Sequence, residues 1–306
     1  MKETTADFQA SDGKTIRVLK WSNDSAAPKA AVLIVHGVTE YGGRYRGFAQ
    51  VLCDRGYVAY APDHRGHGRT VESPEELGHY AENDGFQRII EDLFELTAKI
   101  KSENPGKPLV IYGHSMGSML VRLCVSQKGG DYDACILTGT MGRGPYGFGR
   151  GLARILCALS GGTRRIAFLG DIAFGPFSRP FKPNRTQFDW LSRDEAEVDK
   201  YVADPLCGFP LTNAFFRDFF GGMARMYRKS MMAAIPLDLP ILCCSGSRDP
   251  VGGMSGAVEA LADEYRALGI KEVDCRIFPD ARHELLNETN RREVMEYLAD
   301  WADAAL

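Results

Sequence analysis

Leu109-Val-Ile-Tyr-Gly-His-Ser-Met-Gly117 is the most informative stretch of the 306-residue chain. Its first four residues are apolar, as in a buried strand, and a helical pattern follows Gly117. A serine in Gly-x-Ser-x-Gly between a strand and a helix lies on a sharp turn, where Gly113 and Gly117 leave room for the close backbone approach. The sequence therefore predicts an exposed Ser115 hydroxyl. The Met116 amide, at the helix N-terminus, is predicted to face developing negative charge.

Short apolar runs bounded by turn residues alternate with helical patterns along the chain. The predicted strands cover residues 16–21, 30–35, 58–61, 109–112, 134–138, 241–245 and 273–278. The predicted helices cover residues 44–55, 86–101, 115–127, 258–268 and 290–305. Strands that are apolar on both faces and alternate with helices are typical of a mostly parallel sheet flanked by helices. We therefore expect an α/β fold.

The segment 142–236 interrupts this alternation. It contains no predicted sheet strand, begins with a glycine-rich stretch that could act as a hinge, and holds most of the 16 phenylalanines. We expect a mainly helical cap, inserted between a first core part at 1–141 and a second at 237–306. The phenylalanines are explained either by packing within the cap or by packing together with a lipid-facing surface. A transient contact of the cap with a membrane surface is left open.

A base must take the proton of a serine hydroxyl before the oxygen becomes a strong nucleophile. In chains with this strand-turn-helix motif, an acid and then a histidine follow the serine. Of the six histidines, only His283 follows Ser115, and it lies in a loop after the last predicted strand. We therefore predict that Ser115 is the nucleophile and His283 the base.

The acid is expected between these two residues, just after a strand. Asp249 meets this requirement, because it closes Ile241-Leu-Cys-Cys-Ser-Gly-Ser-Arg-Asp249. Its predicted role is to fix the tautomer of the imidazole and to stabilise the imidazolium. Asp280 is the nearest rival, but it shares a loop with His283 and follows no separate strand.

Acyl transfer also needs two backbone N–H donors for the oxyanion. One is predicted to be Met116. The other is predicted to be Val38, in the loop His36-Gly-Val-Thr-Glu40, where Gly37 allows a sharp turn. The stretch Asp63-His-Arg-Gly-His-Gly68 has no matching metal-ligand spacing elsewhere, so we interpret it as a structural loop. We predict no metal and no cofactor.

Composition excludes several classes of protein. A net charge of −3 is not that of a nucleic-acid-binding protein. The chain has neither a signal-peptide pattern at its start nor an apolar run of about 18 residues, so we expect a cytoplasmic protein. The eight cysteines form no C-x-x-C pair and are expected to be reduced. The oligomeric state is not predicted.

Several motifs carry a resemblance that runs in order along nearly the whole chain. They are His36-Gly-Val-Thr-Glu40, Gly43-Arg-Tyr45, Asp63-His-Arg-Gly-His-Gly68, Gly113-His-Ser-Met-Gly117, Arg248-Asp-Pro250 and Arg282-His-Glu-Leu-Leu-Asn287. Together they resemble the monoacylglycerol lipase and lysophospholipase branch of the α/β-hydrolases. The resemblance implies an α/β-hydrolase fold with the triad and oxyanion amides named above. It also implies a cap with an acyl channel, and a cap cysteine, Cys207, near that channel.

The expected function is therefore hydrolysis of a lipid-like carboxylic ester through an acyl-enzyme on Ser115. Two departures from the family's pattern matter: Val38 stands where a small residue is common, and Tyr41 where a histidine is common. The bulk of Val38 favours a narrower acyl entrance. A short-chain carboxylesterase or thioesterase is the alternative enzyme, and an inactive binding protein is the alternative class. A peptidase is disfavoured, because no carboxylate cluster marks an amine site.

Overall fold

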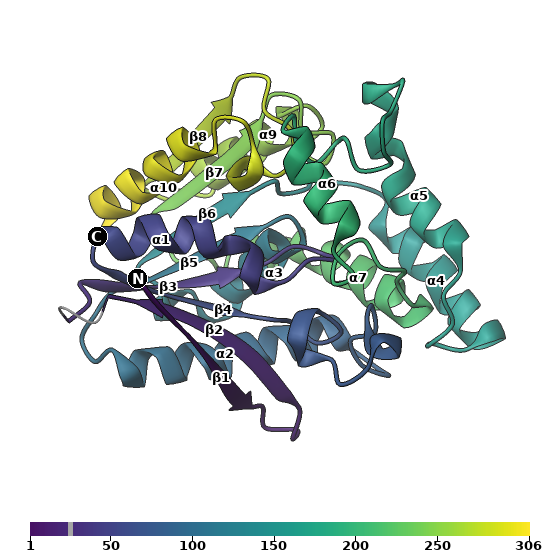
Figure 1. Cartoon of the computed structure of the whole chain (residues 1–306), viewed down its shortest axis with the longest axis horizontal. Helices are drawn as coiled ribbons and strands as arrows, with labels where there is room; N and C mark the ends of the chain where they lie inside the picture. The colour runs from purple at the N-terminus through teal and green to yellow at the C-terminus, as the bar shows by residue number, and fades with distance from the viewer. Residues whose placement is uncertain (24–26) are drawn as a thin grey trace.

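The computed structural model describes residues 1–23 and 27–306 (Figure 1). The remaining residues, 24–26, belong to the predicted first core part and lie outside this description. Within the described residues, eight strands form one sheet in the order β1-β2-β4-β3-β5-β6-β7-β8. The strands are β1 (Lys2–Gln9), β2 (Thr15–Ser22), β3 (Ala30–Val35), β4 (Tyr57–Pro62), β5 (Leu109–His114), β6 (Ala134–Thr138), β7 (Ile241–Gly246) and β8 (Val273–Phe278). The pairs β1–β2 and β2–β4 are antiparallel and all others are parallel, so the predicted, mostly parallel sheet is confirmed.

Helices cover both faces of this sheet. They are α1 (Arg46–Asp54), α2 (Gly85–Glu103), α3 (Met116–Lys128), α4 (Tyr146–Ser160), α5 (Ala167–Ser178), α6 (Glu195–Ala203), α7 (Asn213–Met226), α8 (Lys229–Met232), α9 (Gly256–Ala267) and α10 (Arg291–Ala305). Short 3-10 turns cover Gly42–Tyr45, Gly68–Thr70, Pro74–Glu76, Gly129–Asp131, Arg179–Phe181 and Leu285–Asn287. Along β3, Leu33 and Val35 join the core under α2, α3 and α9, whereas Val32 and Ile34 join the core under α1 and α10. This alternation explains why the central strands are apolar on both faces.

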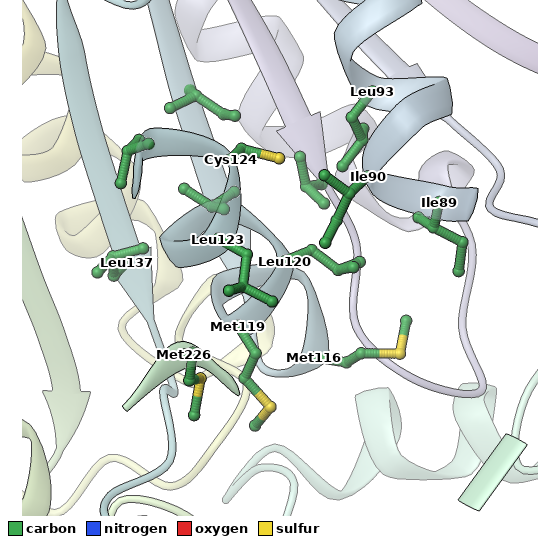
Figure 2. Packing of buried hydrophobic residues seen from close by; sticks show 14 of the residues in the cluster. Ile89, Ile90, Leu93, Met116, Met119, Leu120, Leu123, Cys124, Leu137 and Met226 are labelled. Carbon is green, nitrogen blue, oxygen red and sulfur yellow. The ribbon is translucent and has the colours of Figure 1, made fainter. Parts of the chain in front are cut away.

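Helix α3 is buried around nearly its whole circumference (Figure 2). Leu120 and Leu123 are fully buried in the same core as Ile89 and Ile90 of α2, and Met226 of α7 joins this core. Truncation of a buried leucine to alanine costs about 2–5 kcal/mol, so this packing strongly favours one position of α3. Because Ser115 directly precedes α3, the same packing fixes the position of that serine.

Helices α4 to α8 all lie between β6 and β7, in the segment predicted as an insertion. Figure 1 shows α4, α5, α6 and α7 together at the end of the sheet toward which the central strands point. Phe215, Phe216 and Phe219 of α7 are buried in the main core, so this segment is packed on the sheet layer beneath it. In the glycine-rich stretch, residues 141–145 form no regular secondary structure, and residues from Tyr146 onward form the first turns of α4.

The eight cysteines are all free, and six of them are buried. Within the described residues, no helix combines the length and the apolar character needed to cross a bilayer.

Candidate active site

Ser115 lies on the predicted turn between β5 and α3. Its backbone has φ 52° and ψ −121°, a region that residues other than glycine rarely adopt. A Cβ atom on Gly117 would collide with the carbonyl oxygen of Val35, and one on Gly113 would lie 2.6 Å from the carbonyl oxygen of Gly117. Both positions therefore require glycine. The turn presents Ser115 at the wall of a cavity.

His283 and Asp249 are brought together behind this cavity. The Nδ1 atom of His283 lies 3.0 and 3.1 Å from the two carboxylate oxygens of Asp249, which is fully buried. Burial disfavours the charged imidazole, but the attraction of Asp249 and its hydrogen bond outweigh burial, so the pKa of His283 is raised above 6.5. Asp280, the rival acid, is exposed and receives no hydrogen bond from His283 within the described chain. The structure therefore pairs Asp249 with His283.

Three further residues hold the imidazole of His283 in place. The ring centroids of His114 and Trp190 lie 4.7 and 5.0 Å from that of His283. A Cβ atom on Gly139 would lie 2.8 Å from Cε1 of His283. Ser115 lines the same cavity as His283, although no hydrogen bond joins its hydroxyl to the imidazole in the part of the chain that is described. Catalytic hydrogen bonds are commonly long without substrate and shorten when it binds.

The loop after β3 lines the cavity with residues 37–39. The Gly37 N–H donates to Oε1 of Glu40 at 2.5 Å, and the Thr39 N–H donates to Nε2 of His67 at 3.2 Å. Between them, the Val38 N–H has no hydrogen-bond acceptor among the described residues. The Met116 N–H, in the first turn of α3, has no acceptor in its own helix. The two amides predicted as oxyanion donors are therefore uncommitted.

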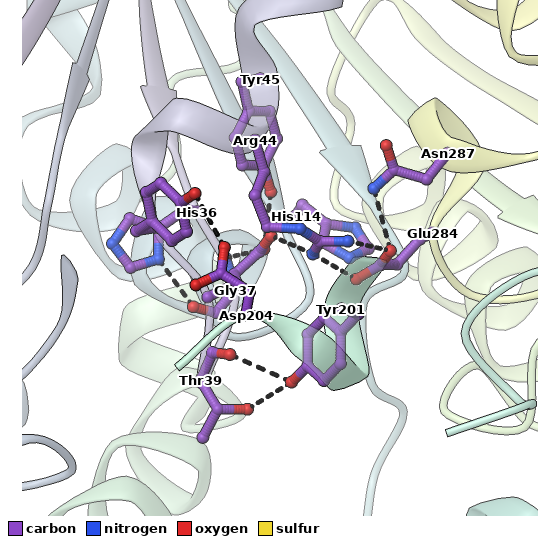
Figure 3. Close-up of polar contacts among 12 residues, drawn as sticks. His36, Gly37, Thr39, Arg44, Tyr45, His114, Tyr201, Asp204, Glu284 and Asn287 are labelled. Carbon is purple, nitrogen blue, oxygen red and sulfur yellow. Dashed lines mark hydrogen bonds and ion pairs between the residues drawn. The ribbon is translucent and has the colours of Figure 1, made fainter. Parts of the chain in front are cut away.

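Arg44 joins this loop to the loop after β8 (Figure 3). It donates to Oε2 of Glu40 at 2.8 Å and to both carboxylate oxygens of Glu284 at 2.6 and 2.7 Å. The Tyr45 hydroxyl donates to Glu40 at 2.8 Å. Burial raises the pKa of Glu40, whereas for Glu284 the attraction of Arg44 outweighs burial and lowers the pKa to about 2. Two buried carboxylates thus share one guanidinium beside the cavity.

The insertion is hydrogen-bonded to both of these loops. The Tyr201 hydroxyl donates to the carbonyl oxygen of Thr39 at 3.0 Å (Figure 3). The Gly208 N–H donates to the same oxygen at 3.0 Å. At the other loop, the Glu284 N–H donates to the carbonyl oxygen of Leu191 at 2.7 Å. These contacts fix the base of the insertion against the residues around Ser115.

The cavity at Ser115 has a volume of about 550 Å³. One side of α5 forms part of its wall, through Ala167, Gly170, Asp171, Phe174, Gly175 and Ser178. Residues at spacings of three and four share one helix face, and this face is mostly small or apolar. A Cβ atom on Gly175 would meet nothing within 4 Å, and one on Gly170 would lie 4.0 Å from Phe216, so the two glycines keep the cavity wide.

The histidines near residues 63–68 have structural roles. The His64 N–H donates to Nε2 of His36 at 3.0 Å, and the Asp63 carboxylate accepts two backbone N–H groups at 2.8 and 2.7 Å. Burial lowers the pKa of His36, lowers that of His64 to about 3 and lowers that of His67 to about 4, so all three rings are neutral at pH 7. No group of three side chains able to hold a metal is found in residues 1–23 and 27–306.

The sequence did not reveal the contacts of Arg44, Trp190 and Gly139. Arg44 and Glu284 each lie in a motif that adjoins a predicted active-site loop. Their place in these motifs is the one feature of the sequence that could have indicated a role near the site. Trp190 carried no comparable signal, because it lies in the insertion. Cys207, expected near the channel, is buried beside the cavity wall, which includes the next residue, Gly208.

Comparisons with known proteins agree with this geometry. The chain is 28% identical to the monoacylglycerol lipase of Mycolicibacterium smegmatis, over 92% of this chain and 90% of the relative. It is 25% identical to the monoglyceride lipase of Homo sapiens, over 91% of this chain and 86% of the relative. A crystal structure of a thermostable carboxyl esterase from Bacillus coagulans in complex with glycerol superposes with a TM-score of 0.92 and 26% identity, covering 100% of this chain and 99% of that one.

The structural similarity confirms the predicted α/β-hydrolase fold. Residues 26–290 match the sequence model of the Hydrolase_4 family, described as "Serine aminopeptidase, S33". This match spans most of the chain, and it includes Ser115, Asp249 and His283. The chain belongs to this family of α/β-hydrolases.

Proposed function

We propose that this chain is a serine ester hydrolase in which Ser115 is the nucleophile, His283 the base and Asp249 the orienting acid. One observation carries the proposal: the strained turn presents Ser115 to a cavity that His283 also lines. The Nδ1 atom of this histidine is hydrogen-bonded to Asp249. A hydroxyl, an imidazole and a buried carboxylate in this order are the parts that acyl transfer requires.

In the acylation step, the Ser115 oxygen attacks the ester carbonyl while Nε2 of His283 takes the hydroxyl proton. Asp249 holds the proton on Nδ1 and so leaves Nε2 free to act as the base. The carbonyl oxygen becomes negative and accepts hydrogen bonds from the amides of Val38 and Met116. His283 then gives its proton to the leaving alcohol, and an ester links the acyl group to Ser115.

In the deacylation step, water takes the place of the alcohol. His283 removes a proton from this water, which attacks the acyl-enzyme, and the same two amides hold the second oxyanion. The proton returns to Ser115 as the carboxylic acid leaves. The nucleophile, the base, the orienting acid and the two oxyanion donors all belong to the chain itself.

The cavity favours a substrate with an apolar acyl chain. Its volume of about 550 Å³ lies in the usual range for sites that bind small molecules, and the face of α5 contributes Ala167, Phe174 and two glycines. Relatives named monoacylglycerol lipase and monoglyceride lipase support a lipid-like monoester. We therefore assign the acyl chain to the space between α5 and Ser115.

Segment 142–236 serves in this proposal as a cap that shields the acyl chain from water. Its outer face carries exposed apolar side chains on two helices: Phe148, Ile155 and Leu159 of α4, and Phe168 and Ile172 of α5. Their spacing places each set on one side of its helix. An exposed apolar face beside a lipid site suits a membrane surface, and we propose that the cap contacts one transiently.

Hydrolysis rates for a series of acyl esters test the proposal. We expect kcat/KM to rise from acetyl through butyryl to octanoyl esters and to fall once the chain exceeds the cavity. A preference for acetyl esters over every longer chain would instead favour the short-chain carboxylesterase. Faster cleavage of amino-acid anilides than of any ester would favour a peptidase, as the family's description suggests.

A further inference from the structure

A second cavity, of about 130 Å³, lies where α2, α4 and α7 meet. Its charged wall residues are Arg150, Arg217, Arg225, Arg228, Asp84 and Asp218. Four guanidinium groups against two carboxylates leave two positive charges in excess, although the whole chain has a net charge of −3. Among the described residues, no wall residue is shared with the cavity at Ser115.

Only part of this positive charge is neutralised within the wall. Arg217 donates to both carboxylate oxygens of Asp218 at 2.7 and 2.9 Å. Arg150 and Arg228 make no side-chain hydrogen bond or ion pair with the part of the chain that the structure describes. Asp84 also forms no ion pair there, so it does not act as their direct counterion.

Arg225 gives the clearest indication of a missing acceptor. Its Nε and Nη2 atoms are buried and have no hydrogen-bond partner within residues 1–23 and 27–306. Burial lowers the pKa of Arg225, and repulsion from Arg228 lowers it further. Buried donors without an acceptor are costly, and native proteins usually satisfy them with a partner or a ligand.

Two adjacent glycines of α7 create this site. A Cβ atom on Gly222 would collide with the ring of Phe86, in the first turn of α2, and one on Gly221 would lie 3.2 Å from Nε of Arg150. Glycine therefore lets α7 approach the N-terminus of α2 and lets Arg150 lie against α7. The N-terminus of α2 is itself capped by Asp218, which accepts the Gly85 N–H at 2.8 Å, so the positive charge of this site comes from the arginines.

We propose that Arg150, Arg225 and Arg228 bind the phosphoryl group of an anionic ligand. A phosphate dianion matches the two excess positive charges of the cavity wall. Its oxygens also match the planar fork of guanidinium donors, which binds phosphate in a bidentate manner. Free phosphate and the phosphomonoester headgroup of a lipid offer this same chemistry.

Binding at this site connects the insertion to the core, because Arg150 lies on α4, Arg225 lies on α7, and the first turn of α2 forms the opposite wall. A ligand that binds only the folded state stabilises it in proportion to the logarithm of its concentration above Kd. We therefore expect phosphate to raise the thermal midpoint of unfolding of the wild type, and we expect its binding to saturate in a direct titration.

Isothermal titration calorimetry with sodium phosphate, against chloride of equal ionic strength, tests the proposal. The wild type should show one saturable site. Arg225→Gln and Arg228→Gln should each weaken binding roughly ten- to a hundredfold, the loss expected for one charge-assisted hydrogen bond. Lys229→Gln is the matched control, because Lys229 is the exposed neighbour of Arg228 and does not line the cavity, so this variant should bind as the wild type does.

Absence of saturable phosphate binding by the wild type would overturn the proposal, and so would equal affinity in all three variants. Arg228 is exposed, so Arg228→Gln remains a valid test even if Arg225→Gln does not fold. Co-sedimentation with vesicles of phosphatidate in phosphatidylcholine then separates the two sources. A loss of vesicle binding in Arg228→Gln but not in Lys229→Gln identifies a lipid headgroup, whereas equal vesicle binding identifies free phosphate.

Discussion

Arg44 donates two hydrogen bonds to Glu284, the residue that follows His283 in the chain. The same guanidinium bonds to Glu40, which in turn holds the Gly37 amide beside Val38. One side chain thus connects the loop proposed to bind the oxyanion with the loop that carries the proposed base. The two loops of the candidate active site are held together by an ion pair between residues 240 positions apart in the chain, Arg44 and Glu284.

Replacement of Arg44 should therefore destabilise the protein strongly. Arg44→Met keeps most of the side-chain length but leaves the buried Glu40 and Glu284 without a counter-charge, which typically costs 3–5 kcal/mol, so we expect a loss of about that size. Glu284→Gln leaves Arg44 paired with Glu40 and should cost less. Urea unfolding monitored by circular dichroism measures both, and an Arg44→Met variant as stable as the wild type would contradict the coupling.

The pH dependence of activity follows from His283. The neutral imidazole is the base, and Asp249 raises its pKa above 6.5, so kcat/KM should rise with pH through an ionisation above that value. In Asp249→Asn, burial remains and the attraction is lost, so the pKa should fall below 6.5. Proton NMR titration of His283 measures this shift.

Asp249→Asn should also lower turnover by roughly 10⁴, the loss known for a triad in which the imidazole takes the wrong tautomer. Asp280→Asn is the control and should behave as the wild type, since Asp280 is exposed and accepts no hydrogen bond from His283 in the described structure. An unchanged pKa of His283 in Asp249→Asn, or a larger loss of turnover in Asp280→Asn, would show that Asp249 is not the orienting acid.

Gly170 should determine how long an acyl chain the cavity accepts. Its added Cβ atom would make only an ordinary contact with Phe216, at 4.0 Å, so Gly170→Leu fills the cavity without a backbone clash. We expect octanoyl esters to lose about tenfold or more in kcat/KM while acetyl esters keep their rate. Gly151→Leu on α4, where a Cβ atom meets nothing within 4 Å, is the control. An equal loss for both esters would argue against the acyl site.

The outer face of the cap should govern contact with membranes. Phe148 and Leu159 are each 79% exposed, so Phe148→Ser with Leu159→Ser should leave stability and the hydrolysis of soluble esters nearly unchanged. Co-sedimentation with phosphatidylcholine vesicles should fall severalfold. Leu237→Ser removes a 48% exposed apolar side chain elsewhere and should have no effect. Unchanged vesicle binding in the double variant would show that this face of the cap does not contact membranes.

The sequence predicted the elements whose physical pattern is local. The seven predicted strands are all present. The five central ones, β3 to β7, are buried on both faces and therefore almost wholly apolar, and Gly113 and Gly117 mark a turn that only glycine permits. Strand β1 was missed, because its residues are almost all exposed and therefore polar. Strand β1 forms one edge of the sheet, and it has no alternation of apolar and polar residues from which it could have been predicted.

Contacts between distant residues were not predictable in this way. The ion pair of Arg44 with Glu284 and the contact of Trp190 with His283 arise only when the insertion and two loops meet. No spacing along the chain encodes such a meeting. Glycine weakens helices, so the helix that starts at Tyr146 was not predicted; it is supported by its packing on α7. The hinge expected around residues 142–151 stays a prediction.

The central claim is that Ser115 carries the acyl group, and covalent labelling tests it most directly. After reaction with a fluorophosphonate, intact-mass and peptide mass spectrometry should find one adduct, on Ser115. Ser115→Ala should retain the fold, take up no label and lose about 10⁶ in turnover, as in other serine hydrolases. A label on another residue, or ester hydrolysis that persists at the wild-type rate in Ser115→Ala, would contradict the account.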